Sequence, residues 1–135
     1  MEGNSEQVWL CVVNKENFEV VKEKRVYGVP ARAHNQIGKI RVGDILVFYV
    51  ISPIRCILGI SKSTSSTFEE KKLFPWKDRI YPYRIEISEV EEVRVRSKEF
   101  IGKISSIKNR IPMGTSLIPI SRKDYETIRL LANQK

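Results

Sequence analysis

The sequence has few of the residues that build metal centres and disulfide frameworks. Its 135 residues include one histidine and two cysteines, too few soft ligands for a typical zinc site and too few thiols for a disulfide framework. Cys11 and Cys56 each lie in a short apolar run, as buried free cysteines do, and a disulfide or shared metal is the alternative. We therefore expect no metal ion and no other cofactor.

Long apolar runs and targeting signals are also missing. No apolar run is long enough to span a membrane, and the N-terminal MEGNSEQ lacks the basic and apolar regions of a secretion signal. We therefore expect a cytoplasmic protein. An excess of Ile over Leu, together with many Lys, Arg and Glu residues, hints at a thermophilic source.

Catalytic signatures are absent as well. The sequence has no P-loop and no GxSxG, GxGxxG, CxxC or HExxH motif. The single histidine, His34, has neither a nucleophile nor an acid beside it in the sequence. The sequence thus favours a binding protein. An enzyme or accessory protein that acts on a nucleotide or tRNA, with His34 as acid or base, is the alternative.

Positive charge is what the chain has in excess. The formal net charge is +8 and the isoelectric point is about 9.6, which favours polyanionic partners, above all nucleic acid. Basic residues gather in segments 31–41, 71–79 and 103–110, and acidic residues gather in segment 86–93. A solvated basic surface without a function is the alternative. A small-molecule or protein-interaction domain whose basic face is incidental also remains open.

The hydrophobic pattern predicts five or six short strands. They are a buried strand at Val8–Val13, a second at Ile45–Ile51, its antiparallel return at Ile54–Ser61 with a bulge at Gly59, a half-buried strand from Tyr83 that bends near Val90, and an edge strand over residues 113–120 that contains Pro119. Strands kinked in this way predict a compact mixed β-barrel.

Two helices and one long loop complete the prediction. Asn14 caps a helix that buries Phe18 and Val21, and Ser121 with Asp124 opens a terminal helix. Segment 62–82 is polar, and a short helix over residues 68–74 would shorten it. The fold class is therefore α+β, a mixed β-barrel with short helices packed around it. We expect one domain over residues 1–135, with residues 1–7 as a flexible tail.

Residues 26–37 (VYGVPARAHNQI) form a run that neither a helix nor a strand explains. Tyr27 in this run and Trp76 in the later loop offer rings on which a nucleobase can stack. Both rings could instead pack inside the protein, with Trp76 as a plug over the barrel mouth. The polar candidates are Asn14, Asn35 and backbone groups near Gly28 for the base edge, and Arg32, Lys77 and Arg79 for phosphate.

The succession of motifs resembles an EVE domain, a member of the PUA-like superfamily and a relative of the YTH domain. The segments that carry the resemblance are WLCVVN, VYGVPARAHNQIGKIRVGDILVFYV, ILGI, YPYRIEI and GTSLIPISRKDYETI, which run in order from Val8 to Leu131. The resemblance implies a pseudo-barrel that binds nucleic acid, with a pocket for a modified base flipped out of a strand. RNA is the expected partner, and modified DNA is the alternative.

The resemblance also implies where the pocket lies. Tyr27 matches the first cage aromatic, where relatives have tryptophan, and Trp76 or Phe74 matches the second. The other expected pocket residues are Asn14, Gly28, Val29, Pro30, Ala31, His34 and Asn35. The ligand would be a modified nucleobase whose identity the motifs leave open.

Overall fold

The computed structural model describes residues 6–77, 79–104 and 117–134 of the chain. The strands are β1 (Val8–Val13), β2 (Val26–Val29), β3 (Ile45–Val50), β4 (Cys56–Lys62), β5 (Phe68–Glu69), β6 (Tyr83–Glu86), β7 (Glu91–Arg96) and β8 (Leu117–Ile120). The helices are α1 (Lys15–Lys24), a 3-10 turn η1 (Ala31–Ala33), α2 (His34–Ile37), α3 (Ser97–Phe100) and α4 (Arg122–Asn133).

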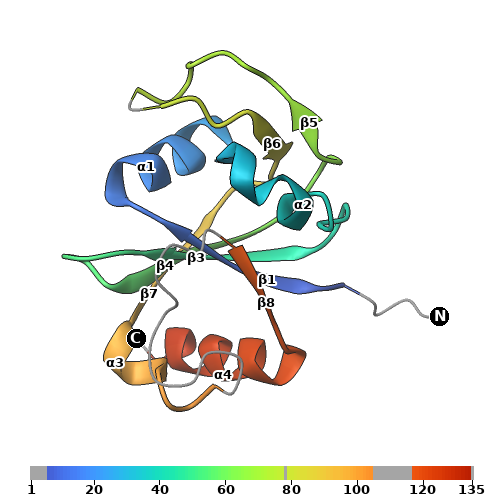
Figure 1. The fold of residues 1–135 in the computed structure, drawn as a ribbon. Coiled ribbons are helices and arrows are strands. Elements are labelled where there is room, and N and C mark those ends of the chain that lie inside the picture. Colours follow the sequence, from blue (N-terminus) through green and yellow to red (C-terminus); the bar gives the residue numbers. More distant parts are fainter. Residues whose placement is uncertain (1–5, 78, 105–116, 135) are drawn as a thin grey trace.

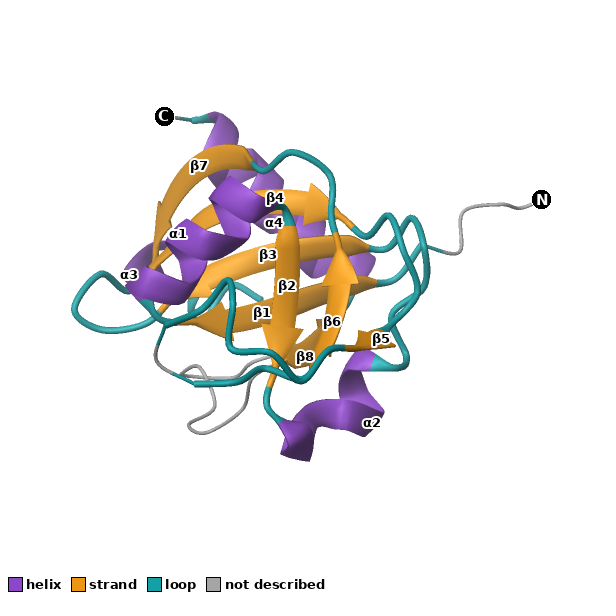
Figure 2. Cartoon of the chain, turned by 90° about the horizontal axis from the view of Figure 1, so that it is seen from above, coloured by secondary structure: helices purple, strands orange, loops and turns teal. Residues whose placement is uncertain are grey.

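A five-stranded sheet forms the middle layer, in the order β7-β4-β3-β1-β8. One face of it is covered by α1, α2 and a three-stranded sheet of order β2-β6-β5, and the other face by α3 and α4 (Figure 1). Viewed from above, β2 and β6 cross over the strands of the larger sheet (Figure 2). The protein is thus α+β, as expected from the sequence.

The central strands of the larger sheet are buried on both faces. The central pair, β1 and β3, runs parallel, and β3 pairs antiparallel with β4. Every residue of β3 is buried, because alternate side chains enter two different cores. The predicted buried strands at Val8–Val13 and Ile45–Ile51 are confirmed, the second ending at Val50.

Gly59 marks the predicted bulge in β4. The pairing of β4 shifts register beside Gly59 with both neighbouring strands. A Cβ atom on Gly59 would stand 2.5 Å from Val90 Cγ1, so only glycine lets the connection between β6 and β7 pack this closely. The strand begins at Cys56 instead of at Ile54, since Ile54 belongs to the preceding turn.

Both predicted helix caps are confirmed. The Asn14 side chain accepts a hydrogen bond from Asn17 N at 2.8 Å, and the Ser121 hydroxyl accepts one from Asp124 N at 3.0 Å. Phe18 and Val21 are buried beneath α1, and Tyr125, Ile128 and Leu131 are buried beneath α4. Cys11 and Cys56 are buried free cysteines, the first of the two alternatives.

The predicted mixed β-barrel is corrected in one respect, because the larger sheet does not close. The two edges of the larger sheet, β7 and β8, do not pair, and the three-stranded sheet is separate. Separate layers of helices and strands cover the two faces of the larger sheet, so each face has its own core without closure of the sheet. Across the described ranges there are eight strands rather than five or six.

Two smaller expectations are also corrected. The run from Val26 to Ile37 does have regular structure, because its start is β2 and its end is η1 followed by α2. Residues 68–74 form no helix, since Phe68 and Glu69 pair with β6 as the two-residue strand β5. At the start of the described residues, Glu6 lies 3.3 Å from Arg122 and Gln7 N donates a hydrogen bond to Asp44, and the flexible tail over residues 1–7 stays a prediction.

Two further expectations are met, and others concern residues outside the described ranges. Pro119 lies in the edge strand β8, as predicted, and the chain bends between β6 and β7 around Val90. Most of the basic segment 103–110 and the predicted strand residues 113–116 lie outside the described residues. Among the helices described, none is long and apolar enough to cross a membrane.

Candidate functional site

The loop between β5 and β6 places an indole ring on the surface of β2. Trp76, in this loop, packs against Gly28 so closely that a Cβ atom at position 28 would stand 2.7 Å from its Cη2 atom. The same Cβ would stand 2.9 Å from Tyr81 Cβ. Glycine at position 28 is therefore what allows an aromatic ring to lie against the strand.

A buried arginine holds this loop in place. Arg84 on β6 is 5% exposed, and its guanidinium lies 5.0 Å from the centre of the Trp76 ring. It donates hydrogen bonds to the carbonyl oxygens of Tyr81 at 2.8 Å, of Phe74 at 3.0 Å, and of Lys72. Burial lowers the pKa of Arg84, and the nearby Glu70 carboxylate partly offsets this. The guanidinium thus closes the loop around Trp76.

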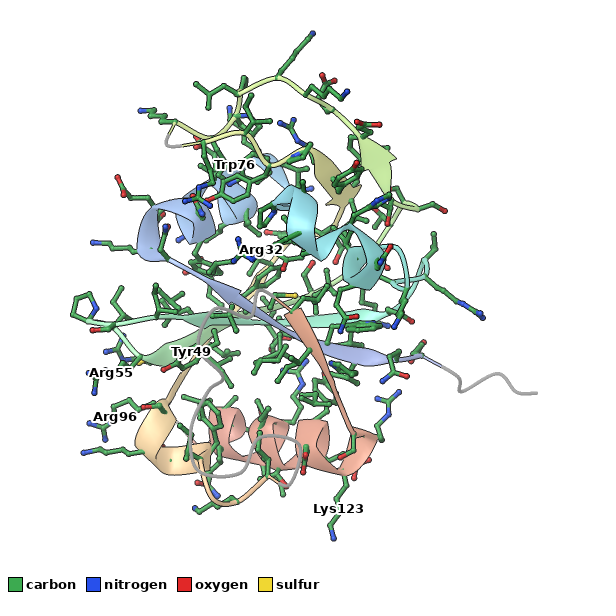
Figure 3. All side chains as sticks on the ribbon, in the orientation of Figure 1. Arg32, Tyr49, Arg55, Trp76, Arg96 and Lys123 are labelled. Carbon is green, nitrogen blue, oxygen red and sulfur yellow. The ribbon has the colours of Figure 1, made fainter. Side chains whose placement is uncertain are left out.

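The first turn of α1 supplies polar groups beside the loop. Asn17 Nδ2 donates to Tyr81 Oη at 2.6 Å, and the Tyr81 ring meets the Trp76 ring edge to face at 5.1 Å. The Asn14 side-chain oxygen is occupied by its cap bond to Asn17 N. Gly28, Trp76, Tyr81, Asn17 and Arg84 form what we call the Trp76 site. Figure 3 shows Trp76 among the side chains above α1.

Tyr27 points away from the Trp76 site. It is 1% exposed and packs edge to face on Phe48 of β3 at 5.6 Å. Side chains alternate along β2, so Tyr27 enters the core while position 28 faces Trp76. Burial raises the pKa of Tyr27, with the Cys11 thiol adding to it, and burial raises the pKa of Cys11 too. The expected pocket with Tyr27 and Trp76 as facing walls is not formed here.

The remaining aromatic candidate, Phe74, is the exposed one. It is 58% exposed and has the Lys24 ammonium 5.6 Å from its ring centre. Trp76 itself is 2% exposed, so its ring is covered in this structure. The basic candidates Lys77 and Arg79 are exposed on the same loop, and Arg32 is exposed on η1. Figure 3 places Trp76 and Arg32 on the same side of the larger sheet.

His34 and Asn35 lie at the exposed start of α2, on the segment that follows β2. The His34 ring stacks on Tyr83 of β6 with centres 3.8 Å apart and planes 8° from parallel. Pro30 and Ala31 lead from β2 into this segment, while Val29 is buried in the core. In the parts of the chain that are described, no group of three metal-binding side chains occurs.

Sequence reasoning missed four residues of this region: Asn17, Tyr81, Tyr83 and Arg84. A buried arginine is not visible in an alternating strand pattern, which assigns Arg84 to the solvent face. The YPY tripeptide is a usable signal, because its rings, Tyr81 and Tyr83, offer surfaces for aromatic pairs, and they pack on Trp76 and His34.

The fold is an α+β module in which helices and a small second sheet cover the two faces of a five-stranded sheet. The EVE domain family model matches residues 7–131, so the chain belongs to the EVE domain family. A UPF0310 protein of Pyrococcus abyssi is 36% identical over 138 aligned residues, covering 91% of this chain and 97% of that protein.

Solved YTH domains share the fold. The Pho92 YTH domain in complex with m6A has a TM-score of 0.78 at 10% identity, covering 100% of this chain and 91% of that one. The YTH domain of the Zygosaccharomyces rouxii MRB1 protein, in complex with N6-methyladenosine RNA, has a TM-score of 0.76 at 12% identity and covers 97% and 89%. At these identities the likeness establishes the fold alone.

Proposed function

We propose that the chain is a non-enzymatic module that binds RNA in preference to DNA and recognises a modified base at the Trp76 site. Membership of the EVE family and the fold shared with YTH domains solved with m6A and with N6-methyladenosine RNA support this proposal. So does the net charge of +8, which favours a polyanion.

The observation that carries the proposal is the seating of the Trp76 indole on Gly28. Two atoms of the indole, Cη2 and Cζ3, lie against the bare backbone of Gly28, so an outward movement of the loop would open a space there. A flipped base is flat and fits such a space, with Trp76 stacked on its outer face and the Gly28 backbone beneath it. Stacking on one aromatic ring contributes about 1–3 kcal/mol.

Polar groups at the rim of this space would read the base edge. Asn17 is one, through the side-chain amide that bonds Tyr81 in the closed site. Asn14 is another, and it would act as a donor, because its oxygen is already used in capping α1. We assign phosphate contacts to Arg32, Lys77 and Arg79, which are exposed, and contacts with the neighbouring nucleotide to His34, Asn35 and Phe74.

Tyr27 takes a supporting part in this proposal. Its ring packs on Phe48 and lies beside the Cys11 thiol, so it fixes β2 to the larger sheet. Gly28 and the Val29 to Ala31 backbone then keep their place when the loop opens. The base meets the backbone of this strand, and the Tyr27 ring stays in the core.

The energetics favour a base that carries an extra methyl group. Flipping a base costs a few kcal/mol, and moving the covered Trp76 ring adds to that cost. Each buried methylene or methyl group recovers about 0.8 kcal/mol. An unmodified base is therefore expected to bind several-fold more weakly than its methylated form, with modest affinity for either as a free nucleoside.

The test is a titration of the isotope-labelled protein with adenosine and N6-methyladenosine, followed by short RNA and DNA strands that contain each. We expect the Trp76 indole signal to shift with the methylated nucleoside, and the RNA strand to bind more tightly than the DNA strand. A spectrum that is unmoved by every nucleoside and indifferent to methylation in strands would refute base recognition.

Two substitutions separate stacking from simple burial. Trp76→Phe keeps a ring, whereas Trp76→Leu keeps only apolar volume. Both lose packing area, and the free energy of unfolding of each is measured by urea denaturation. We expect Trp76→Phe to keep part of the preference for the methylated base and Trp76→Leu to lose it. Equal preference in the two variants would contradict a stacking role for Trp76.

The enzymatic alternative is tested with His34→Ala. The His34 ring is exposed and stacked on Tyr83, an arrangement that suits a flat contact surface better than proton transfer, which needs an orienting acid. We expect His34→Ala to weaken strand binding by a small factor. Loss of a chemical conversion of tRNA or nucleotide in this variant would favour the enzyme.

A further inference from the structure

A cavity lies apart from the Trp76 site, at the start of β1. Its volume is about 480 Å³. It opens between β1, the edge strand β8 and the turn that joins α2 to β3, toward the N-terminal end of β1 in Figure 1. The lining residues are Gln7, Trp9, Lys39, Arg41, Asp44 and Pro119. None of them belongs to the Trp76 site.

A buried carboxylate fixes the walls of this cavity. Asp44 is 4% exposed. It accepts hydrogen bonds from Gln7 N at 3.0 Å, from Trp9 Nε1 at 3.1 Å and from Arg41 N at 2.9 Å. One side chain thus ties the start of β1 to the turn before β3, so the Trp9 ring and the backbones of Gln7 and Arg41 are held in place before any ligand arrives.

The charge of the lining favours an anion. Lys39 and Arg41 are exposed, and among the described residues their side chains form no hydrogen bond or ion pair. The negative charge of Asp44 is met by the three N–H groups that it accepts from. With Lys39 and Arg41 positive and Asp44 negative, the lining of the cavity carries a formal net charge of +1. A concave surface of this sign concentrates anions.

Phosphate is the anion that suits these groups best. The Arg41 guanidinium can donate two parallel hydrogen bonds to phosphate oxygens, and the Lys39 ammonium adds a point charge. The Gln7 side-chain amide can donate a further bond. Trp9 is 4% exposed, so the cavity offers no open aromatic face for a second base.

The position of the cavity links it to the proposed base site. Segment 32–41 runs from Arg32 along η1 and α2 to Arg41, and Arg32, His34, Asn35 and Lys39 are all exposed along it. Residues 32–37 of this segment lie in η1 and α2 and span on the order of 10 Å at helical rise, and Lys39 and Arg41 follow in the turn before β3. A strand with one base at Trp76 can therefore follow this segment with its phosphates.

We propose that the cavity is a phosphate subsite for the RNA strand whose modified base lies at the Trp76 site. This inference rests on the proposed function for the identity of the strand. It adds a claim of its own, that Lys39 and Arg41 bind a phosphate a few nucleotides away from the recognised base.

The two tryptophans of the chain allow a direct test, because one indole lies at each site. In proton–nitrogen correlation spectra, Trp9 Nε1 reports on the cavity through its bond to Asp44, and the Trp76 indole reports on the base site. We expect N6-methyladenosine to shift Trp76 alone and a short RNA strand containing it to shift both. Inorganic phosphate and a mononucleotide serve as further probes.

A matched pair of double variants gives the quantitative test. Lys39→Gln/Arg41→Gln removes two charges at the cavity, and Lys98→Gln/Lys123→Gln removes two exposed charges on α3 and α4. Lys123 lies on the opposite side of the larger sheet from Trp76 (Figure 3). We expect the cavity variant to bind the strand roughly tenfold more weakly than the control. The slope of log affinity against log salt concentration should fall by the amount that corresponds to about one to two phosphate contacts. Nucleoside affinity should not change.

Each other outcome is decisive. Equal strand affinity in the two double variants overturns the subsite, and unchanged nucleoside binding would then leave the proposed function intact. If phosphate or mononucleotide shifts Trp9 as strongly as the strand at equal phosphate concentration, the cavity is a site for free phosphate esters and the strand assignment is wrong. If the strand shifts Trp9 but neither strand nor nucleoside moves Trp76, the subsite stands and the base site fails.

Discussion

The Trp76 indole occupies the space that a side chain at Gly28 would fill. A Cβ atom at position 28 would stand 2.7 Å from Trp76 Cη2 and 3.1 Å from Trp76 Cζ3. Real Cβ atoms essentially never come as close as 2.7 Å to another heavy atom, so the indole must shift if residue 28 gains a methyl group. The position of the loop therefore depends on glycine at position 28, and a substitution at either Gly28 or Trp76 tests their contact.

Gly28→Ala should displace the loop. The Tyr81 Cβ atom, 2.9 Å from the added methyl group, cannot move without the backbone, so the loop must shift as a whole. We expect a loss of about 1–3 kcal/mol in the free energy of unfolding, as for overpacked cores. We also expect weaker binding of N6-methyladenosine. In a Trp76→Leu background the loss should shrink in part, because the shorter side chain removes the clash with the indole while the clash with Tyr81 Cβ stays. An undiminished loss there would place the clash elsewhere.

Tyr27→Phe should leave ligand binding unchanged. The ring stays in the core beside Phe48 and only the hydroxyl next to Cys11 is lost. We expect a cost of about 1 kcal/mol in stability and no change in affinity for the methylated nucleoside, measured by titration calorimetry. Tyr27→Ala should cost about 3–5 kcal/mol through its cavity. A large affinity loss in Tyr27→Phe, with stability intact, would restore Tyr27 as a contact residue.

Arg84→Lys should loosen the loop while keeping the charge. A lysine cannot reach the three carbonyl groups that the Arg84 guanidinium binds. Unpaired carbonyls and the lost bonds should cost about 1–3 kcal/mol. Trp76 should become more accessible to a fluorescence quencher, which is measured in a Trp9→Phe background. Arg94→Lys, an exposed change on β7, is the control, and equal quenching in the two variants would contradict the role of Arg84.

The sequence predicts the central elements well because they are set by local chemistry. The strand Val8–Val13 and the caps at Asn14 and Ser121 follow from short apolar runs and from side chains that bond their own backbone. Gly59 is readable for a similar reason, since glycine within a strand marks a bulge or a close approach. Each of these features leaves a signal in its own few residues, even though Gly59 serves a contact with the distant Val90.

The layered arrangement and the Trp76 site are harder to predict because they depend on contacts between distant segments. The parallel pairing of β1 with β3 and the open edges at β7 and β8 set the architecture, and neither leaves a local signal. Tyr27 and Gly28 are neighbours in sequence, yet they face opposite sides of β2. Without the strand assignment for β2, the aromatic ring was expected to face the ligand, and the glycine was not recognised as the seat of Trp76.

The ion pair between Glu91 and Arg129 should give the stability a measurable pH dependence. Arg129 on α4 binds the Glu91 carboxylate of β7 through two bonds, of 2.8 and 2.7 Å. These hydrogen bonds, more than the small opposing effect of burial, lower the pKa of Glu91 below its ordinary value of 4.5. The folded state therefore holds the Glu91 proton less tightly than the unfolded state. The stabilisation by this ion pair is therefore complete above the pKa that Glu91 has in the unfolded chain. It is lost as the pH falls through the pKa of Glu91 in the folded protein.

Glu91→Gln should accordingly lower the free energy of unfolding near neutral pH and lose its effect in acid. The Glu91 side chain is 52% exposed, so solvent screening limits the loss to about 0.5–1 kcal/mol. Glu92→Gln is the matched control, because its carboxylate is 70% exposed and lies 3.6 Å from Lys22 without a bidentate bond. Urea denaturation at a series of pH values compares the two. A Glu91→Gln deficit that persists well below the ordinary carboxyl pKa would show that its cause is packing between β7 and α4 instead of charge.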